Sequence, residues 1–289
     1  MYASVKFGSL TRGLADKYSD NDLLVVCPDR DRKSISEDCN FSEYNISFFS
    51  NKQLSSMRDK GSLFLQHIKR DGVIIYDKGG AFASFLTDCH FISPDDNEIK
   101  RCESTLSLIS TLPEERVLNT WKADFVYCVS RDYLIKKLAM EGLLAFSIDE
   151  IITLSLKCFN FKKEDFDKLK KLREIKAINR SEISDSYDYG DISFLINDWL
   201  NTLNLTFNFI PEKKRIKLID CLFKADYSST YEALRCLEAL YILLEKKGIN
   251  HIEHHKIIKY IKSPNLYRSL QSSKKTVIRK YLYEIYSFF

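Results

Sequence analysis

The stretch that decides the fold is KFGSLTRGLADKYSDNDLLVV, residues Lys6 to Val26. A glycine–serine pair, Gly8-Ser9, follows a short apolar-alternating run, and two aspartates separated by one residue, Asp20 and Asp22, open the next apolar run. Glycine allows the backbone to turn sharply, and serine is a favoured first residue of a helix. The stretch therefore predicts a strand, a helix near residues 9–16 and a second strand, with polar groups where the strands end and begin.

Three more apolar runs extend this pattern. A buried strand is expected over Asp22–Cys27, where Pro28 stops it, and further strands over Tyr44–Phe49 and Val73–Tyr76. Residues 51–72 have helical spacing and end at Gly72. The order β-α-β-β-α-β within the first 80 residues predicts a small mixed sheet backed by helices.

From about Asn97 the pattern changes to apolar residues at three- and four-residue spacing, which is typical of helices. The segments concerned are 121–142, 147–159, 193–204, 215–223, 229–248 and 274–289, and residues 181–191 form an acidic loop. We therefore expect an α+β protein, with a small mixed-sheet domain at residues 1–96 and an α-helical bundle domain at residues 97–289.

The charge of the chain is unevenly distributed. Its net charge is +4, but residues 157–180 hold nine Lys/Arg against four Asp/Glu, and residues 246–281 hold ten against one. These two segments carry +5 and +9, which leaves −10 on the rest. The asymmetry favours a polyanionic or acidic partner for the C-terminal half, and the alternative is that the lysines form solvated helix faces.

Cysteine usage and hydropathy indicate the compartment. The eight cysteines are spread singly, without a C-x-x-C pair, so neither a zinc ribbon nor a small disulfide framework is expected. The first ten residues lack an apolar leader segment, and no apolar run approaches the roughly 18 residues that cross a bilayer. We expect a reduced, soluble, cytoplasmic protein with no membrane partner.

The opening stretch also has a specific chemistry. Gly8 lets a ligand approach the backbone, and Ser9 offers a hydroxyl and an amide at a helix N-terminus, where a triphosphate binds well. Strand alternation places Asp20 and Asp22 on one face, where their mutual repulsion is relieved by a cation such as magnesium. The alternative for the two aspartates alone is a polar turn.

With these residues, GSLTRGLADKYSDNDLLVV resembles the G-S, R-G and S-D-x-D-L signature of the DNA polymerase β-like nucleotidyltransferases, especially the minimal and defence-associated types. HIKRDGVIIYD, residues 67–77, is similar to the segment that closes the minimal domains, so the resemblance covers about residues 3–77. It implies that Gly8 and Ser9 hold nucleotide phosphates, that Asp20 and Asp22 are catalytic and bind Mg²⁺ or Mn²⁺, and that Arg12 is a structural or phosphate-facing residue.

The chain departs from that family in two ways. It begins almost at the glycine–serine strand, without the helix that often precedes it. The third carboxylate of the family is expected at Asn45 or Ser47, neither of which is acidic, and Glu43 is the nearest candidate. Two interpretations stay open, an active enzyme with weakened acceptor activation and a degenerate nucleotide-binding module.

The predicted activity is magnesium-dependent transfer of a nucleoside monophosphate from an NTP or dNTP to a hydroxyl acceptor. Lys136, with Arg131 and Lys137, is a candidate for contacting the triphosphate, and surface charge is the alternative.

The acceptor is expected to be a nucleic-acid end or growing oligonucleotide, because the C-terminal third is basic. Protein side chains, including those of a partner from the same operon, and small molecules such as an aminoglycoside are the alternatives. A bacterial defence or toxin–antitoxin setting is implied by the resemblance.

Overall fold

The structure is a computed structural model that describes residues 2–8, 11, 13, 21–37, 43–112, 114–180, 191–206, 227–262 and 272–288. Most of the helix expected at residues 9–16, all of the one expected at residues 215–223 and nearly all of the expected acidic loop lie outside the described residues. The chain divides into two compact units, which we call the sheet unit (Met1–Asp95 with Ile135–Cys158) and the helical unit (Asp96–Leu134 with Phe159–Phe289). A functional boundary at residues 96 and 97 stays a prediction.

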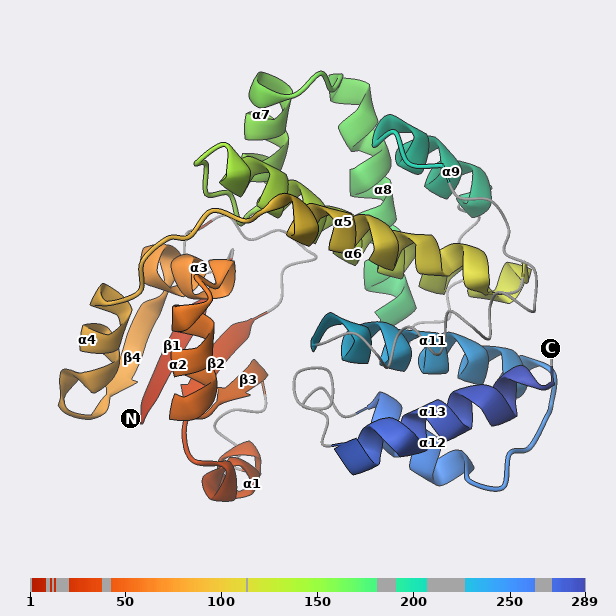
Figure 1. Cartoon of the computed structure of the whole chain (residues 1–289), viewed down its shortest axis with the longest axis horizontal. Coiled ribbons are helices and arrows are strands. Elements are labelled where there is room, and N and C mark those ends of the chain that lie inside the picture. The colour runs from red at the N-terminus through yellow and green to blue at the C-terminus, as the bar shows by residue number, and fades with distance from the viewer. Residues whose placement is uncertain are drawn as a thin grey trace. The chain divides into compact units, whose positions relative to one another are not determined.

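Four strands form the sheet of the sheet unit, in the order β3-β2-β1-β4 (Figure 1). The strands are β1 (Ala3–Phe7), β2 (Asp22–Val26), β3 (Asn45–Phe49) and β4 (Val73–Asp77). β1 runs antiparallel to both β2 and β4, whereas β2 and β3 are parallel. The sheet is therefore mixed, which confirms the predicted α+β class, and each predicted strand is present to within one residue or two.

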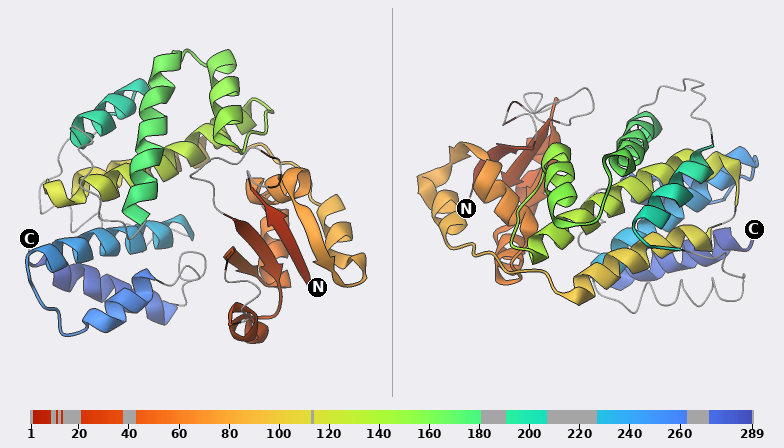
Figure 2. Two further views of the ribbon diagram at one scale, coloured as in Figure 1. Left: turned by 180° about the vertical axis from the view of Figure 1, so that it is seen from behind. Right: turned by 90° about the horizontal axis from the view of Figure 1, so that it is seen from above.

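Strand alternation gives this sheet two apolar faces. On one face, alternate residues of β1, β2 and β3 pack against the helices α2 (Asn51–Asp59), α3 (Leu63–Asp71) and α4 (Ala81–Thr87) (Figures 1 and 2). The other residues of β2 pack with Tyr2, Tyr44 and Ile35, and Ile35 comes from the short helix α1 (Arg32–Ser36). Because β2 is buried on both faces, its sequence is a continuous apolar run rather than an alternating one.

The segment expected as one helix over residues 51–72 is two helices, α2 and α3. Ser50 starts α2 with a capping box, in which its Oγ accepts from the Gln53 amide and Gln53 Oε1 accepts from the Ser50 amide. The chain then turns at Gly61, whose φ of +64° lies in the left-handed region. The single-helix expectation was wrong because Gly61 interrupts the helical hydrogen bonds, as a glycine in this conformation commonly does at a helix end.

Replacing Gly61 with alanine is expected to destabilise the sheet unit by about 2 kcal/mol, because an L-residue is strained at this φ. A Cβ on residue 61 would also lie 2.3 Å from Cβ of Ile92. Thermal unfolding of Gly61→Ala measures the effect. The double variant Gly61→Ala with Ile92→Ala should recover part of the loss, and no recovery would show that crowding against Ile92 does not contribute.

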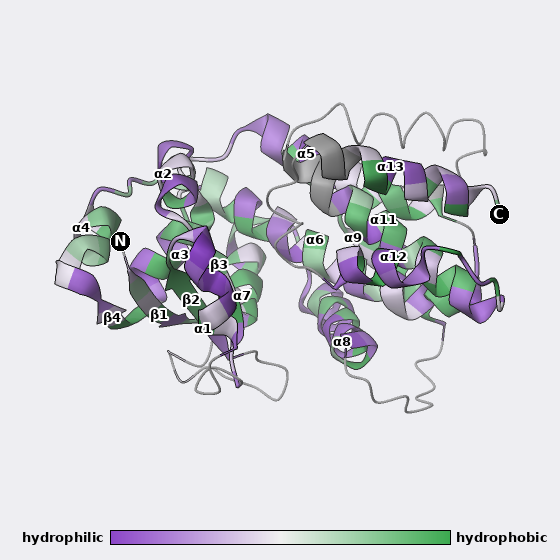
Figure 3. Cartoon of the chain, turned by 90° about the horizontal axis from the view of Figure 1, so that it is seen from below, coloured by the Kyte–Doolittle hydropathy of each residue, from purple (hydrophilic) through white to green (hydrophobic). Residues whose placement is uncertain are grey.

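The helical unit is built from amphipathic helices, as the spacing predicts. Apolar residues recur along the helices with hydrophilic residues between them (Figure 3). The helices after α4 are α5 (Asp96–Ser107), α6 (Asn119–Met140), α7 (Ile148–Cys158), α8 (Lys163–Arg180), α9 (Ile192–Thr202), α11 (Tyr227–Lys246), α12 (His254–Ile261) and α13 (Ser272–Tyr286). Helix α6 ends in the sheet unit, to which α7 also belongs. In the described part of the chain, no helix is long and apolar enough to span a membrane.

Candidate functional site

The turn after β1 brings Gly8 against the first residue of β2. Gly8 has a φ of +94°, and a Cβ on it would lie 3.2 Å from Oδ2 of Asp22. The register explains this, because Phe7 pairs with Asp22 across the antiparallel ladder and Gly8 is the next residue. A side chain at residue 8 would be strained and would crowd the Asp22 carboxylate. With glycine at this position, the backbone of residue 8 stays accessible beside the negative charge of Asp22.

Asp22 lies on the sheet face that the helices cover, since alternation places it with Leu24 and Val26. In the parallel pairing of β2 and β3 its neighbour is Asn45, whose Nδ2 donates to Oδ1 of Asp22 at 2.9 Å. Asn45 is thus opposite Asp22 at one of the two places where the sequence resemblance leads one to expect a third carboxylate. An amide there orients Asp22 but cannot act as a metal-binding carboxylate.

Glu43 lies in the turn before β3 and is exposed. Its carbonyl oxygen accepts a hydrogen bond from Nδ2 of Asn21 at 3.5 Å, and its negative charge helps to raise the pKa of Lys6, after the larger contribution of Tyr44. Lys6 lies on the opposite face of the sheet from Phe7, and so from the face that carries Asp22. The Glu43 backbone therefore lies beside the start of β2. The charged residue on which the Glu43 side chain acts is Lys6.

Thr11 connects the Gly8 turn to the C-terminal end of α3, a contact that the sequence analysis missed. Its Oγ1 lies 2.7 Å from the carbonyl oxygen of Gly8 and 3.1 Å from that of Asp71. The only sequence signal is the position of a threonine three residues after the glycine, where a hydroxyl can bond back to the backbone. Thr11 fixes the turn on a helix that is packed under the sheet.

Arg70 joins that end of α3 to the first turn of α7 and to the segment before it. Its guanidinium donates to both carboxylate oxygens of Asp71 at 2.8 and 2.7 Å, to Glu150 at 3.0 and 3.1 Å, and to the carbonyl oxygen of Leu144 at 2.6 Å. The hydrogen bond with Asp71 is the main cause of the raised pKa of Arg70. The guanidinium carbon also lies 4.7 Å from the ring centre of Phe146. Charge-assisted bonds of this kind hold planar groups in a defined geometry.

His67 extends the same cluster toward β1. Its ring stacks on Phe146 with centres 4.6 Å apart, and it meets the Phe7 ring edge-on at 5.8 Å. Phe7 is the residue before Gly8, so the cluster supports the residue that leads into the turn. These contacts join residues that are 60 and 79 positions apart in the sequence, which is why sequence patterns did not reveal them.

The other predicted site residues divide into two groups. Lys136 is half-buried near the end of α6 and belongs to the sheet unit with Gly8 and Asp22, whereas Arg131 belongs to the helical unit. Ser9, Arg12 and Asp20 lie outside the described residues, so their roles stay predictions. The structure thus brings together Gly8 and Asp22 among the predicted residues, and adds Asn45 and Thr11.

The donor set suits a hard cation in part. Oδ2 of Asp22 faces the glycine turn, and carboxylate oxygens are the ligands that magnesium prefers. Within the described residues there is no group of three or more His, Cys, Asp or Glu side chains that would hold a metal by itself. A cation at Asp22 would need further oxygens, which nucleotide phosphates supply in sites where the metal is shared with the substrate.

Comparison with known proteins identifies the class of this fold and site. Residues 2–128 match the family model described as a nucleotidyltransferase domain. The match confirms the predicted resemblance: residues 2–128 are similar to the nucleotidyltransferase domain, in keeping with the DNA polymerase β-like superfamily. No curated protein and no solved structure matches the chain. This similarity supports nucleotidyl transfer as the general activity.

Proposed function

We propose that the protein is a magnesium-dependent nucleotidyltransferase that transfers a nucleoside monophosphate from an NTP or dNTP to the end of a nucleic acid or growing oligonucleotide. The observation that carries the proposal is the Gly8–Asp22 pair, a glycine with positive φ whose open side faces a carboxylate oxygen at the start of a buried strand. The family match supports the class of reaction. The bacterial defence or toxin–antitoxin setting rests on the resemblance alone.

In this proposal each site residue has a role. The backbone at Gly8 and Ser9 binds the triphosphate, with Arg12 and Lys136 as its cationic contacts. Asp22 and Asp20 hold the cation, and Asn45 orients Asp22. Glu43 stays the candidate third carboxylate from the sequence, and its side chain would have to turn from Lys6 toward the face that carries Asp22. When bound, magnesium supplies positive charge to the triphosphate and lowers the pKa of the acceptor hydroxyl.

The reaction breaks the phosphoanhydride bond between the α- and β-phosphates and forms a phosphoester bond to the acceptor. The acceptor hydroxyl oxygen attacks the α-phosphorus in line, the bond from that phosphorus to the bridging oxygen breaks, and pyrophosphate leaves. This chain's residues contribute mainly by positioning, because a fixed turn and a fixed carboxylate remove the need to order these groups during the reaction. Thr11 holds the Gly8 turn against the end of α3, and the bonds between Arg70 and Asp71 hold that end of α3 in place.

Replacing Gly8 with valine is expected to weaken nucleotide binding by about tenfold or more, because a β-branched side chain would fill the space beside Asp22. The backbone strain at this φ should also lower stability by about 1–2 kcal/mol. Calorimetric titration of the folded variant with each triphosphate and magnesium measures the binding. Unchanged affinity would contradict a phosphate site at this turn.

The basic region of the helical unit supports a nucleic-acid acceptor. Its lysines on α11, α12 and the following turn are exposed, as are Arg279 and Lys280 on α13. Two of these basic residues have acidic neighbours a turn away, since Lys256 pairs with Glu253 and Lys280 with Glu284. The region still carries a net +9 over residues 246–281, and a charge of this size attracts phosphate backbones.

If this region binds an oligonucleotide, the logarithm of the binding constant should fall linearly with the logarithm of salt concentration. Changing Lys274, Lys275, Arg279 and Lys280 together to glutamine should flatten the slope by about one unit for each phosphate that these side chains neutralise. Mobility-shift titrations at several salt concentrations measure the slope. Nucleoside triphosphate affinity is the control and should not change, and an unaltered slope would exclude these residues.

A second candidate function is nucleotide binding without catalysis. Asn45 favours it, since it stands where the family has an acidic residue and cannot bind a second metal ion as a carboxylate does. Incubation with α-phosphate-labelled triphosphates, followed by separation of oligonucleotide, protein and free nucleotide, distinguishes the alternatives. Label in the oligonucleotide supports the proposal, label on protein indicates nucleotidylation of a polypeptide, and label in neither supports the binding module.

A further inference from the structure

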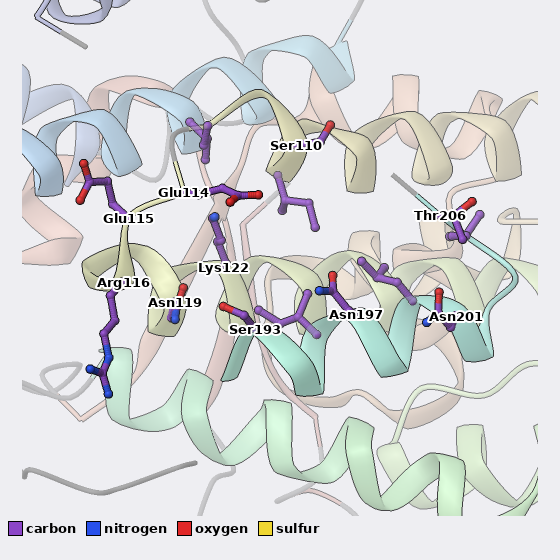
Figure 4. A pocket seen from close by; sticks show the side chains of 15 residues that line it. Ser110, Glu114, Glu115, Arg116, Asn119, Lys122, Ser193, Asn197, Asn201 and Thr206 are labelled. Carbon is purple, nitrogen blue, oxygen red and sulfur yellow. The ribbon is translucent and has the colours of Figure 1, made fainter. Parts of the chain in front are cut away.

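A cavity of about 720 Å³ lies within the helical unit, and nothing in the proposed transfer reaction uses it. One wall is the start of α6 with the two short turns before it, and the other wall is α9 with the residues that follow (Figure 4). Its volume is in the range of sites that bind small molecules. All of its lining residues are described and all belong to one compact unit.

The wall formed by α9 presents neutral polar groups. Ser193, Asn197 and Asn201 follow one another at four-residue spacing, which places them on one face of the helix, and Figure 4 shows their side chains pointing from α9 into the pocket. Asn119 adds a third carboxamide from the opposite wall. In the part of the chain that the structure describes, these four side chains have no hydrogen bond or ion pair with another protein group. Within that part of the chain, their donors and acceptors are therefore open to a ligand.

Four charged residues line one end of the cavity, and their charges cancel. Glu114 and Glu115 oppose Arg116 and Lys122, and Glu115 pairs in addition with Lys247 at 3.5 Å. Burial lowers the pKa of Lys122, while the charge of Glu114 acts in the opposite direction. A balanced set of charges does not attract a triphosphate, a nucleic-acid backbone or a polycation, so the arrangement favours an uncharged ligand.

The remaining surface selects among uncharged ligands. The apolar part of the lining consists of the half-buried Ile109 and Leu205 and the buried Leu112, Ile196 and Leu200. Carboxamides can pair with two atoms of a heterocycle edge at once, as asparagine does with adenine, and apolar side chains cover the faces of such rings. We propose that this cavity binds an uncharged nucleoside through its base, and that adenosine is the preferred one.

The test is calorimetric titration of the full chain with adenosine, without magnesium and with no triphosphate present. Saturable binding that is insensitive to salt is expected, and Asn197→Ala with Asn201→Ala should weaken it by about tenfold or more. Asn250→Ala is the matched control, because Asn250 is an exposed asparagine of the same unit that does not line the cavity. Asn197→Trp, which fills the cavity, should also abolish binding.

Each outcome decides the proposal. Adenosine binding that is lost in both cavity variants and kept in Asn250→Ala and Asp22→Ala supports it, and the last of these separates the cavity from the proposed transfer site. Absence of saturable adenosine binding, or tighter binding of guanosine, cytidine or uridine, would overturn it. Binding that survives the cavity variants, or equal binding of a simple sugar, would overturn it too.

Discussion

Replacing Asp22 with alanine is expected to lower the rate of nucleotidyl transfer by at least about a thousandfold while the fold is retained. The carboxylate lies at the start of β2, with one oxygen held by Asn45 and the other facing the Gly8 turn, so its loss removes a positioned metal ligand. Initial rates with labelled triphosphate and saturating magnesium measure the loss.

The matched control is Asp88→Ala. Asp88 is an exposed aspartate of the same unit at the end of α4, and its removal should leave the rate unchanged. The melting temperature of Asp22→Ala should stay near that of the unchanged protein, because no buried cation loses its only partner. A rate within a fewfold of the unchanged protein would show that Asp22 is not a catalytic residue.

The second large effect concerns stability. Asp124 on α6 is 1% exposed and bonds Arg180 at 2.9 Å and Arg235 at 3.1 Å. Replacing it with alanine should destabilise the helical unit by about 3–5 kcal/mol, since the change leaves the buried guanidinium of Arg235 with less compensating charge. Chemical unfolding measures this. Asp167→Ala removes an exposed aspartate of α8 and should cost no more than about 0.5 kcal/mol.

Asp124 also predicts a pH dependence. Burial by itself would raise its pKa, but the charges of Arg235 and Arg180 outweigh burial, so its pKa lies below the ordinary value of 3.8. The stabilisation is therefore fully present above the unfolded pKa and is lost as the pH falls through the lower folded pKa. Asp124→Ala should flatten the acid limb of the stability curve, and an identical acid limb in the variant would contradict this assignment.

Much of the sheet could be predicted from local sequence because its strands are short apolar runs bounded by Gly8, Pro28 and Gly72. The break at Gly61 was missed, since the apolar spacing on both sides fits one continuous helix. Helix α4 was missed as well, and the structure shows that it begins where Asp77 accepts from the amides of Phe82 and Ala83. Such a cap depends on a strand end several residues away.

The candidate site was predictable only in its local part. Gly8 and Asp22 belong to one continuous stretch, so their spacing carried the signal. Asn45 could be placed opposite Asp22 only through the register of β2 and β3, and Arg70 could be joined to Glu150 only through tertiary packing. Pairs of this kind have no periodicity in the sequence. Ser9, Arg12 and Asp20 lie outside the described residues, and their roles stay predictions.

The most direct test of the proposed function is transfer of labelled α-phosphate by the purified full chain, compared with Asp22→Ala, in the presence of magnesium and a single-stranded oligonucleotide. We expect a labelled, elongated oligonucleotide and released pyrophosphate with the unchanged protein. We expect neither product with Asp22→Ala or after chelation of the metal. Label transfer at equal rates by the two proteins, or no transfer to any acceptor by the unchanged protein, would contradict the proposal that the Gly8–Asp22 site is a nucleotidyltransferase centre.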